Sequence, residues 1–500
     1  MKSGDETMNK KRGKLWKIGA LVLLSLCGLV VMQWLSGRMS LRSVLAVYER
    51  EGESLDWRKV VKPVPENANN GKEDLLAAIS RLPRMYGDWL AWQHAAPAAA
   101  IPHSRYRVPV EIVEYPEDGT RRERWVTNVW SELGPRIEDF GTNWTHARRA
   151  ATNDVIDLGL DWSRGSELEL PHFAPVSYLH AWTRAAVMND LHKGDRETAW
   201  KRLTAGWRIL KIYDEPVLIS ALMRISGAWF LSQATWETLS HGGWTEEQLV
   251  TLQTAIDEVR FVESMDRAIC QTRCGEFALW HRSREDPSLL RKYAPMESPA
   301  MNRFLLDHPW IWRTFYAGDE MAWVLRDYQD GLGELRQGWK TRSLSAYFVA
   351  WPEDHPTPEH FVFSHWPGVA FRMTGFKVFR SELQREFLGT SIAIERYKLR
   401  HNGRSPEALA DLVPGLLPDL PVDWMDGKTL RYRKSGAGNH VLWSVGDDGV
   451  DDGGVPVREF YASSHPVPSD GDWVWPRVAT ELEIQAYLKE LRAELKKSAP

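Results

Sequence analysis

Apolar residues follow a helical period along most of the chain. Between residues 41 and 385 they recur every three or four positions, which is the spacing of one face of an α-helix. The clearest block predicts an antiparallel helix pair at 177–192 and 196–213, with a turn at Gly194 and Asp195 as the N-cap of the second helix. We therefore expect a stack of amphipathic helices in the middle of the chain.

Two local patterns add to this picture. Thr245 is followed three residues later by Gln248, which predicts a capping box at the start of a further helix. Upstream, within 105–129, apolar and polar residues alternate on either side of Asp118 and Gly119, and Asp-Gly is a turn-forming dipeptide. This stretch predicts a β-hairpin.

The N-terminal pattern is an unbroken apolar run. No residue from Ile18 to Leu35 is charged, and a helix of this length rises about 27 Å, close to the thickness of the hydrocarbon core of a bilayer. Basic residues are more frequent before the run than after it, where Arg38 and Arg42 are nearest, and this asymmetry predicts a cytoplasmic N-terminus. We expect a single-pass anchor at 15–37 in the inner (cytoplasmic) membrane, with the rest of the chain outside the cytoplasm.

Two other interpretations of the apolar run stay open. A cleaved signal peptide would have a shorter apolar run and a small-residue exit, whereas Trp34 is typical of a side chain at the membrane interface. A lipoprotein would use Cys27, but Leu26 stands where such a site needs a small residue. The anchor is the interpretation that these residues favour.

The C-terminal part has another pattern. We expect a helix at 381–401, a proline-punctuated loop as far as Trp424, and then a small antiparallel sheet. Its two strands have the sequences LRYRK and HVLWSV, and the residues from Ser435 to Asn439 join them.

This C-terminal stretch resembles the C-terminal half of type II secretion major pseudopilins of the G type. The matching residues are Glu395-Arg396-Tyr397, Gly403-Arg404-Ser405-Pro406, Leu409, Leu412-Val413-Pro414, Asp423 to Gly427, Tyr432-Arg433, and Ser444, Gly446, Asp448 and Gly449. The apolar run lacks the glutamate and processing site of that family, so polymerisation into a pseudopilus is not expected. The whole architecture resembles large uncharacterised membrane-anchored proteins of planctomycete-like bacteria.

An acidic, glycine-rich loop follows the second predicted strand. It contains Asp447, Asp448, Asp451 and Asp452. Carboxylates this close repel one another unless water or a cation neutralises them, and hard oxygen ligands favour calcium. The resemblance to the pseudopilins implies a calcium-binding loop nearby, with Asp470 and Asp472 as the nearest counterparts of its ligands. Our candidate calcium ligands are Asp448, Asp452, Asp470 and Asp472, and the alternative is an exposed acidic turn.

Composition narrows the classes of function. The 500 residues are 26% charged with a formal net charge of -4, which excludes a nucleic-acid binder driven by bulk positive charge. Three cysteines exclude a disulfide scaffold, while Cys270 and Cys274, four positions apart on a predicted helix, could be oxidised or reduced. The sequence contains no H-E-x-x-H, G-x-S-x-G or G-x-G-x-x-G motif.

Tryptophan is unusually frequent, with 26 residues in the chain. Two pairs at helical spacing predict packing between helices: Trp200 with Trp207, and Trp229 with Trp236. Four others lie in proline-containing regions and are the candidates for lining a groove: Trp310, Trp312, Trp351 and Trp366.

Together these patterns predict an α+β protein. The expected parts are a basic tail at 1–14, the anchor at 15–37, a mainly helical tryptophan-rich domain at 38–380, a pseudopilin-like module with a short antiparallel sheet at 381–480 and a terminal helix at 481–500. We expect an extracytoplasmic interaction or envelope-assembly protein that contacts membrane lipid through its anchor and other envelope proteins, with no nucleic-acid partner and no catalytic residue. The alternative is an envelope hydrolase, which would show a deep pocket with converging His, Asp or Glu side chains.

Overall fold

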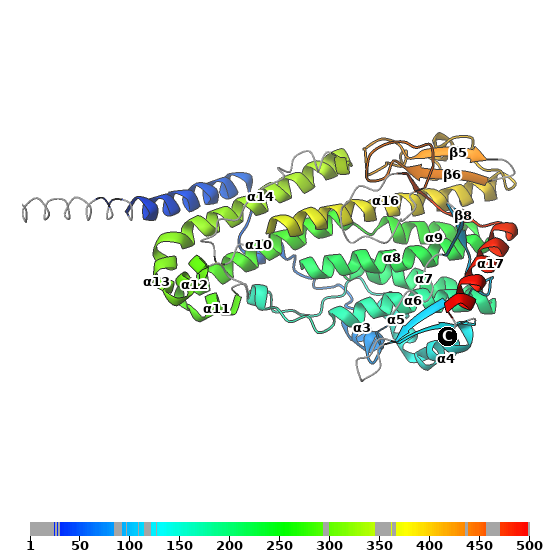
Figure 1. The fold of residues 1–500 in the computed structure, drawn as a ribbon, viewed down its shortest axis with the longest axis horizontal. Coiled ribbons are helices and arrows are strands. Elements are labelled where there is room, and N and C mark those ends of the chain that lie inside the picture. The colour runs from blue at the N-terminus through cyan, green and yellow to red at the C-terminus, as the bar shows by residue number, and fades with distance from the viewer. Residues whose placement is uncertain are drawn as a thin grey trace, which may run out of the picture.

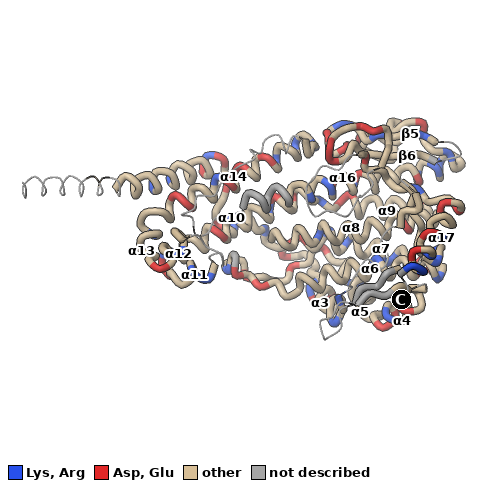
Figure 2. The backbone as a smooth tube through the Cα atoms, in the orientation of Figure 1, with Lys and Arg blue, Asp and Glu red and all other residues tan. Residues whose placement is uncertain are grey.

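The structure is a computed structural model, and helices dominate it. It describes residues 31–84, 93–96, 98–108, 110–114, 122–126, 128–293, 300–345, 367–435, 439–456 and 471–498, with the single positions 25, 28 and 362. Within these residues long helices are combined with small, mainly antiparallel sheets, which confirms the α+β prediction. Figure 2 shows acidic and basic positions interspersed along the body.

The long helices lie side by side along the longest axis of the molecule (Figure 1). They are α6 (Phe173–Lys193), α7 (Arg196–Ile212), α8 (Leu218–His241), α9 (Glu246–Asp257), α10 (Phe261–Glu285), α14 (Ala317–Thr341) and α16 (Pro367–Arg400). Helix α8 is central, because it packs against α6, α7, α10 and α16.

Shorter helices cover the body and its ends. They are α2 (Trp57–Val60), α3 (Lys72–Ile79), α4 (Trp130–Asp139), α5 (Gly141–Ala150), η1 (Trp162–Glu167), α11 (Ser288–Tyr293), α12 (Ala300–Asp307), α13 (Pro309–Ile311), the π-helical turn η2 (Trp312–Tyr316), η3 (Leu409–Leu412) and α17 (Glu481–Ser498).

The predicted turn at Gly194 and the predicted caps at Asp195 and Thr245 are confirmed, whereas α6 begins at Phe173, four residues before the predicted start. Helix α6 ends at Gly194, which has the left-handed φ of 80° that glycine tolerates without strain. The carboxylate of Asp195 accepts a hydrogen bond of 3.0 Å from the backbone N–H of Thr198 at the start of α7. At α9 the Thr245 hydroxyl accepts from the Gln248 N–H at 3.2 Å, and the Gln248 side chain accepts from the Thr245 N–H at 3.0 Å.

Three small sheets complete the fold. They are β1 (Gln93–Ala96) with β2 (Ala99–Ile101) and β8 (Arg477–Val478); β3 (Val110–Glu114) with β4 (Arg122–Val126); and β5 (Arg431–Ser435) with β6 (Asn439–Ser444) and β7 (Trp473–Val474). The β3–β4 and β5–β6 pairs are antiparallel, as predicted. Strand β2 pairs in parallel with β8, so residues about 380 positions apart share one sheet.

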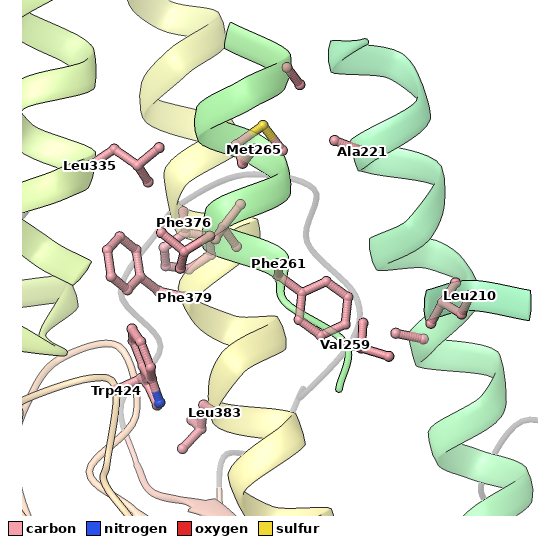
Figure 3. Packing of buried hydrophobic residues seen from close by; sticks show 14 of the residues in the cluster. Leu210, Ala221, Val259, Phe261, Met265, Leu335, Phe376, Phe379, Leu383 and Trp424 are labelled. Carbon is pink, nitrogen blue, oxygen red and sulfur yellow. The ribbon is translucent and has the colours of Figure 1, made fainter. Parts of the chain in front are cut away.

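The main hydrophobic core is continuous from the helical body into the C-terminal module. Helix α16 contributes Phe379 and Leu383 to the packing beside Phe261 of α10, as Figure 3 shows. On its other side Phe379 faces Trp424 of the C-terminal loop, with ring centroids 5.9 Å apart. The predicted boundary between residues 380 and 381 therefore falls inside a helix that both parts share.

An N-terminal helix at 31–51 packs along α14. Its Gly37 approaches Gly318 so closely that a Cβ on Gly318 would lie 2.9 Å from the Gly37 carbonyl oxygen. Among the described residues we find no helix with the length and apolar character of a membrane span. The predicted anchor at 15–37 lies mostly outside them, since only positions 25, 28 and 31–37 belong to the described part.

Gly52 ends this helix in a Schellman motif. Gly52 has a φ of 72°, and the N–H of Glu53 donates to the carbonyl oxygen of Tyr48 at 2.9 Å. The turn directs the Glu53 carboxylate to the guanidinium groups of Arg273 on α10 and Arg336 on α14. Glu53 thus joins the end of the N-terminal helix to two helices of the body.

Candidate functional site

A pocket of about 350 Å³ lies at the seam between the helical body and the C-terminal module. Helices α8 and α16 and the segment that contains β7 form it. We call it the seam pocket, and its lining residues are Leu222, Ile225, Ser226, Trp229, Lys377, Arg380, Ser381, Gln384, Phe387, Trp473, Val474, Trp475 and Pro476. Its volume is within the range of pockets that hold small ligands or single anchor side chains of a partner.

Aromatic rings and one arginine give the seam pocket its character. The Arg380 guanidinium carbon lies 3.6 Å from the centre of the Phe376 ring and 4.5 Å from that of Trp473, so rings hold it by cation–π contacts. Arg380 also forms an ion pair with Asp447, whose side chain is 3% exposed. Trp475 lies over Phe387, with ring centroids 6.1 Å apart. These contacts fix the guanidinium before any ligand arrives.

The described lining of the seam pocket has basic but no acidic side chains, and Asp447, which is not part of the lining, pairs with one of them. The basic residues of the lining are Lys377 and Arg380. Lys377 is exposed, while Gln384 and Ser226 are half-buried and supply polar groups beside the rings. An apolar wall with one or two cations and a few amide or hydroxyl groups suits an apolar ligand that carries an acidic group.

The structure corrects one prediction about tryptophan here. Trp236 is buried at 3% exposure, as predicted for helix packing, and its indole N–H donates to the carbonyl oxygen of Pro476 at 2.7 Å. Trp229, its predicted packing partner on α8, is only half-buried and lines the seam pocket. Helical spacing identifies the face of a helix, but it does not distinguish a closed core from a pocket wall.

Of the four groove candidates, the two that the structure describes do not line the seam pocket. Trp312 is fully buried in η2, and its indole N–H donates to the Glu320 carboxylate at 2.6 Å. Trp310 is 62% exposed on α13. Trp351 and Trp366 lie outside the described residues. The tryptophans that form the pocket, Trp473 and Trp475, were missed, although their alternate spacing predicts one face of a strand.

A second, acidic cleft of about 260 Å³ lies between the end of α9, the start of α10 and α16. Burial raises the pKa of Glu386 and of Asp257, although the Arg385 charge opposes it in both. Arg385 contacts Glu382 at 2.8 Å, Glu386 at 3.2 Å and Asp257 at 3.6 Å. Glu382 also accepts from the N–H of Phe261 at 3.0 Å. The carboxylates therefore converge on an arginine and a helix start, and this network ties α16 to α9 and α10.

A buried Ser-His-Glu cluster was also not predicted. Ser104 donates from its hydroxyl to Glu237, and its oxygen lies 2.5 Å from Nε2 of His241. Burial, with the charges of Arg105 and Arg196, lowers the pKa of His241 to about 4. The Glu237 carboxylate bonds to the serine and to the backbone N–H groups of His103 and Ser104 rather than to the imidazole. The cluster fastens the loop at 101–108 to α8.

The aspartates of the predicted calcium loop are mostly engaged by backbone groups. Asp448 accepts from the Val450 N–H at 3.0 Å, and Asp472 accepts from the N–H groups of Gly454 at 2.6 Å and Asp452 at 3.3 Å. Among the described residues no group of three or more His, Cys, Asp or Glu side chains is placed to hold a metal ion. Asp470 lies outside those residues, so the calcium site stays a prediction.

A calcium titration of the full-length protein checks this prediction. Ligation by Asp448 and its neighbours would raise Tm in millimolar calcium, because an ion that binds only the folded state stabilises it. Asp448→Asn should remove that rise, and Asp419→Asn, an exposed change outside the loop, should keep it. An unchanged Tm in millimolar calcium contradicts the site.

Both described cysteines are free thiols on α10. Burial raises the pKa of Cys270 to about 12 and that of Cys274 to about 11. Their sulfur atoms lie near different oxygens, Asp266 at 3.7 Å and the Ser54 carbonyl at 3.5 Å. Thiols with such pKa values hold little thiolate at neutral pH, so they pack rather than react.

Comparisons of the chain with protein-family models, with curated proteins and with solved structures find no match. The resemblance of the C-terminal module to the pseudopilins therefore stays a prediction from its residues.

Proposed function

We propose that the chain is a membrane-anchored interaction protein of the cell envelope and that the seam pocket receives a partner protein. The partner segment that binds in the pocket carries an apolar or aromatic side chain next to a carboxylate. The observation that supports this proposal is the position of Arg380 between two aromatic rings in a pocket without a described acidic residue.

Energetic arguments favour this ligand class. Tryptophan and arginine side chains in desolvated pockets contribute a large share of the binding energy at protein interfaces. The ion pair with Asp447 and the flanking rings limit the freedom of Arg380, so little side-chain entropy remains to be lost on binding. Lys377 at the exposed edge adds long-range attraction for an acidic partner.

Peptide display on the full-length protein tests the proposal. From a random heptapeptide library we expect enrichment of sequences that place an aromatic or aliphatic residue beside Asp, Glu or the C-terminal carboxylate. Ser226→Trp should abolish this enrichment, because Ser226 lines the pocket and the larger side chain fills it. Val250→Trp, on the outer face of α9 where the side chain is 38% exposed, is the matched control and should retain it.

Two outcomes contradict the proposal. Equal enrichment on the Ser226→Trp protein would mean that peptides bind elsewhere. The dye 8-anilinonaphthalene-1-sulfonate combines an apolar body with an acidic group. If this dye binds the wild type and not Ser226→Trp while no peptide is enriched, the pocket takes a small molecule instead of a partner protein.

The alternative of an envelope hydrolase has its best support in the acidic cleft, where burial raises the pKa of two carboxyl groups. Catalytic acids commonly have such raised pKa values. Asp257, Glu382 and Glu386 of the cleft contact Arg385, however, and Glu382 also accepts from the start of α10, which is the pattern of a structural ion network. We therefore favour binding over catalysis.

A further inference from the structure

Three large apolar side chains are exposed at one end of the molecule. They are Met301 and Phe304 on α12, with exposed fractions of 45% and 47%, and Trp310 on α13, with 62%. Asn302 and Leu305, on the neighbouring face of α12, are buried. We call the segment α12–α13 the tip. Its outward side is apolar although its inward side already packs on the body.

The N-terminal helix leaves the body at the same end. Gln33 donates to Asp319 at 2.9 Å, and Gly37 contacts Gly318, so the helix lies on the first turn of α14, which follows directly after the tip. Figure 1 shows α12 and α13 beside the start of this helix, and α17 at the far end of the molecule. The helix continues the exposed apolar surface, since Met32 is 63% exposed and Met39 is 62% exposed.

Arginines gather where the helix meets the tip. Burial lowers the pKa of Arg284, and the charges of Arg313 and Arg38 lower it further, while Glu285 opposes them. Arg284 on α10 is thus within electrostatic reach of Arg313 on η2 and of Arg38 on the N-terminal helix. An acidic residue is also present on the tip, Asp307, and Arg291 pairs with it at 2.8 Å. Repulsion among like charges at a surface favours an anionic partner.

We propose that the tip rests on the membrane surface, with Met301, Phe304 and Trp310 among the lipid headgroups and the three arginines at the phosphates. A lipid surface is the occupant, because the part of the predicted anchor at 15–37 that precedes residue 31 would enter the bilayer beside the tip. Tryptophan with basic residues is the usual composition of such interfacial contacts. This inference rests on the anchor of the proposed function and adds a second, non-inserted contact that sets the orientation of the body.

Single cysteine labels on the full-length protein test the contact. An environment-sensitive nitrobenzoxadiazole dye is attached at Phe304→Cys, or at Leu482→Cys on α17, where the native leucine is 84% exposed at the opposite end of the molecule. The protein is placed in vesicles of phosphatidylcholine with phosphatidylglycerol. At position 304 we expect emission about twofold higher than in detergent, and quenching by lipids spin-labelled near the headgroup, since interfacial side chains lie about 5–10 Å deep. Position 482 should show neither effect.

The outcomes separate the contact from the anchor. If the protein floats with the vesicles but the label at 304 behaves like the label at 482, the tip contact is wrong and the anchor still stands. Protein that does not float overturns the anchor itself. A third sample, labelled without any substitution, measures the background from the native cysteines. Arg313→Glu should reduce quenching at 304 in vesicles that contain phosphatidylglycerol, and an unchanged signal would contradict the role given to the arginines.

Discussion

Glu53→Ala is expected to lower the free energy of unfolding by about 3–5 kcal/mol, the usual result of removing one partner from a buried ion pair. Glu53 is 13% exposed and accepts from Arg273 at 2.7 Å and from Arg336. The Arg273 side chain is 0% exposed, and its guanidinium lies 4.7 Å from the centre of the Tyr48 ring. Without the carboxylate this buried guanidinium loses the acidic group with which it forms its ion pair.

Urea unfolding of the wild type and the variant, monitored by hydrogen exchange of α10, measures this effect. Glu49→Ala, at an exposed position of the N-terminal helix at 31–51, is the matched control and should change stability by less than about 0.5 kcal/mol. Equal effects of the two substitutions would show that Glu53 does not stabilise the junction. Glu53→Gln keeps the shape of the side chain and should still cause most of the destabilisation seen in Glu53→Ala, because that destabilisation comes from the missing charge.

The same substitution has a predictable pH dependence. Burial would raise the pKa of Glu53, but hydrogen bonds from Arg273 and Arg336 outweigh burial and hold the pKa below its ordinary 4.5. A carboxyl group with a lowered folded-state pKa stabilises the protein above its unfolded-state pKa, and the stabilisation disappears as pH falls through the folded-state value. The difference between wild type and Glu53→Ala should therefore be constant at neutral pH and shrink below about pH 4.5.

Asp423→Asn is expected to destabilise the C-terminal sheet by about 3–5 kcal/mol. The fully buried carboxylate accepts four hydrogen bonds: from the Met425 N–H at 3.0 Å, the Ser444 hydroxyl at 2.7 Å, the Val445 N–H at 3.0 Å and the Arg431 guanidinium at 2.5 Å. These donors belong to the loop before β5, to β5 itself and to the end of β6. An amide keeps one acceptor oxygen but points N–H groups at two of the donors.

Hydrogen exchange of β5 and β6 in the full-length protein measures this loss. The amides at 431–444 should exchange at least about a hundredfold faster in Asp423→Asn than in wild type, since 1.4 kcal/mol corresponds to a factor of ten. Asp419→Asn, an exposed change in the same loop, should leave the rates unchanged. If the amides of β5 stay protected from exchange in Asp423→Asn, the Asp423 carboxylate does not hold the sheet together.

Local features of the fold were predictable from the sequence because their causes are local. Asp195 caps α7 with its own carboxylate, and Thr245 and Gln248 bond to each other within one turn. The antiparallel pairing of β3 with β4 follows from the alternation of apolar and polar residues in the two strands. Trp312 shows the limit of such reasoning. Pro309 suggested a loop, but proline suits the first turn of a helix, and α13 with η2 carries the indole into the core.

The seam pocket was not predictable, because it joins three segments that are distant in sequence. Trp229 comes from α8, Arg380 from α16 and Trp475 from the position just after β7, and their proximity depends on how α16 packs against α8. Helical periodicity identified Trp229 as an inward residue and could not tell which element it would face. The ion pair of Arg380 with Asp447 likewise links two positions that no sequence spacing relates.

The parallel pairing of β2 with β8 sets an order of events during synthesis. Ala99 and Ala100 are fully buried and pair with Arg477 and Val478, which the ribosome adds almost 400 residues later. Until then the edge of β2 is open, and Trp236 lacks the Pro476 carbonyl that accepts its N–H. A chain released early by a stop codon would therefore present an unpaired strand edge beside exposed apolar surface, a form that aggregates or is degraded. A strand made late in synthesis, β8, thus closes the sheet that β1 and β2 begin.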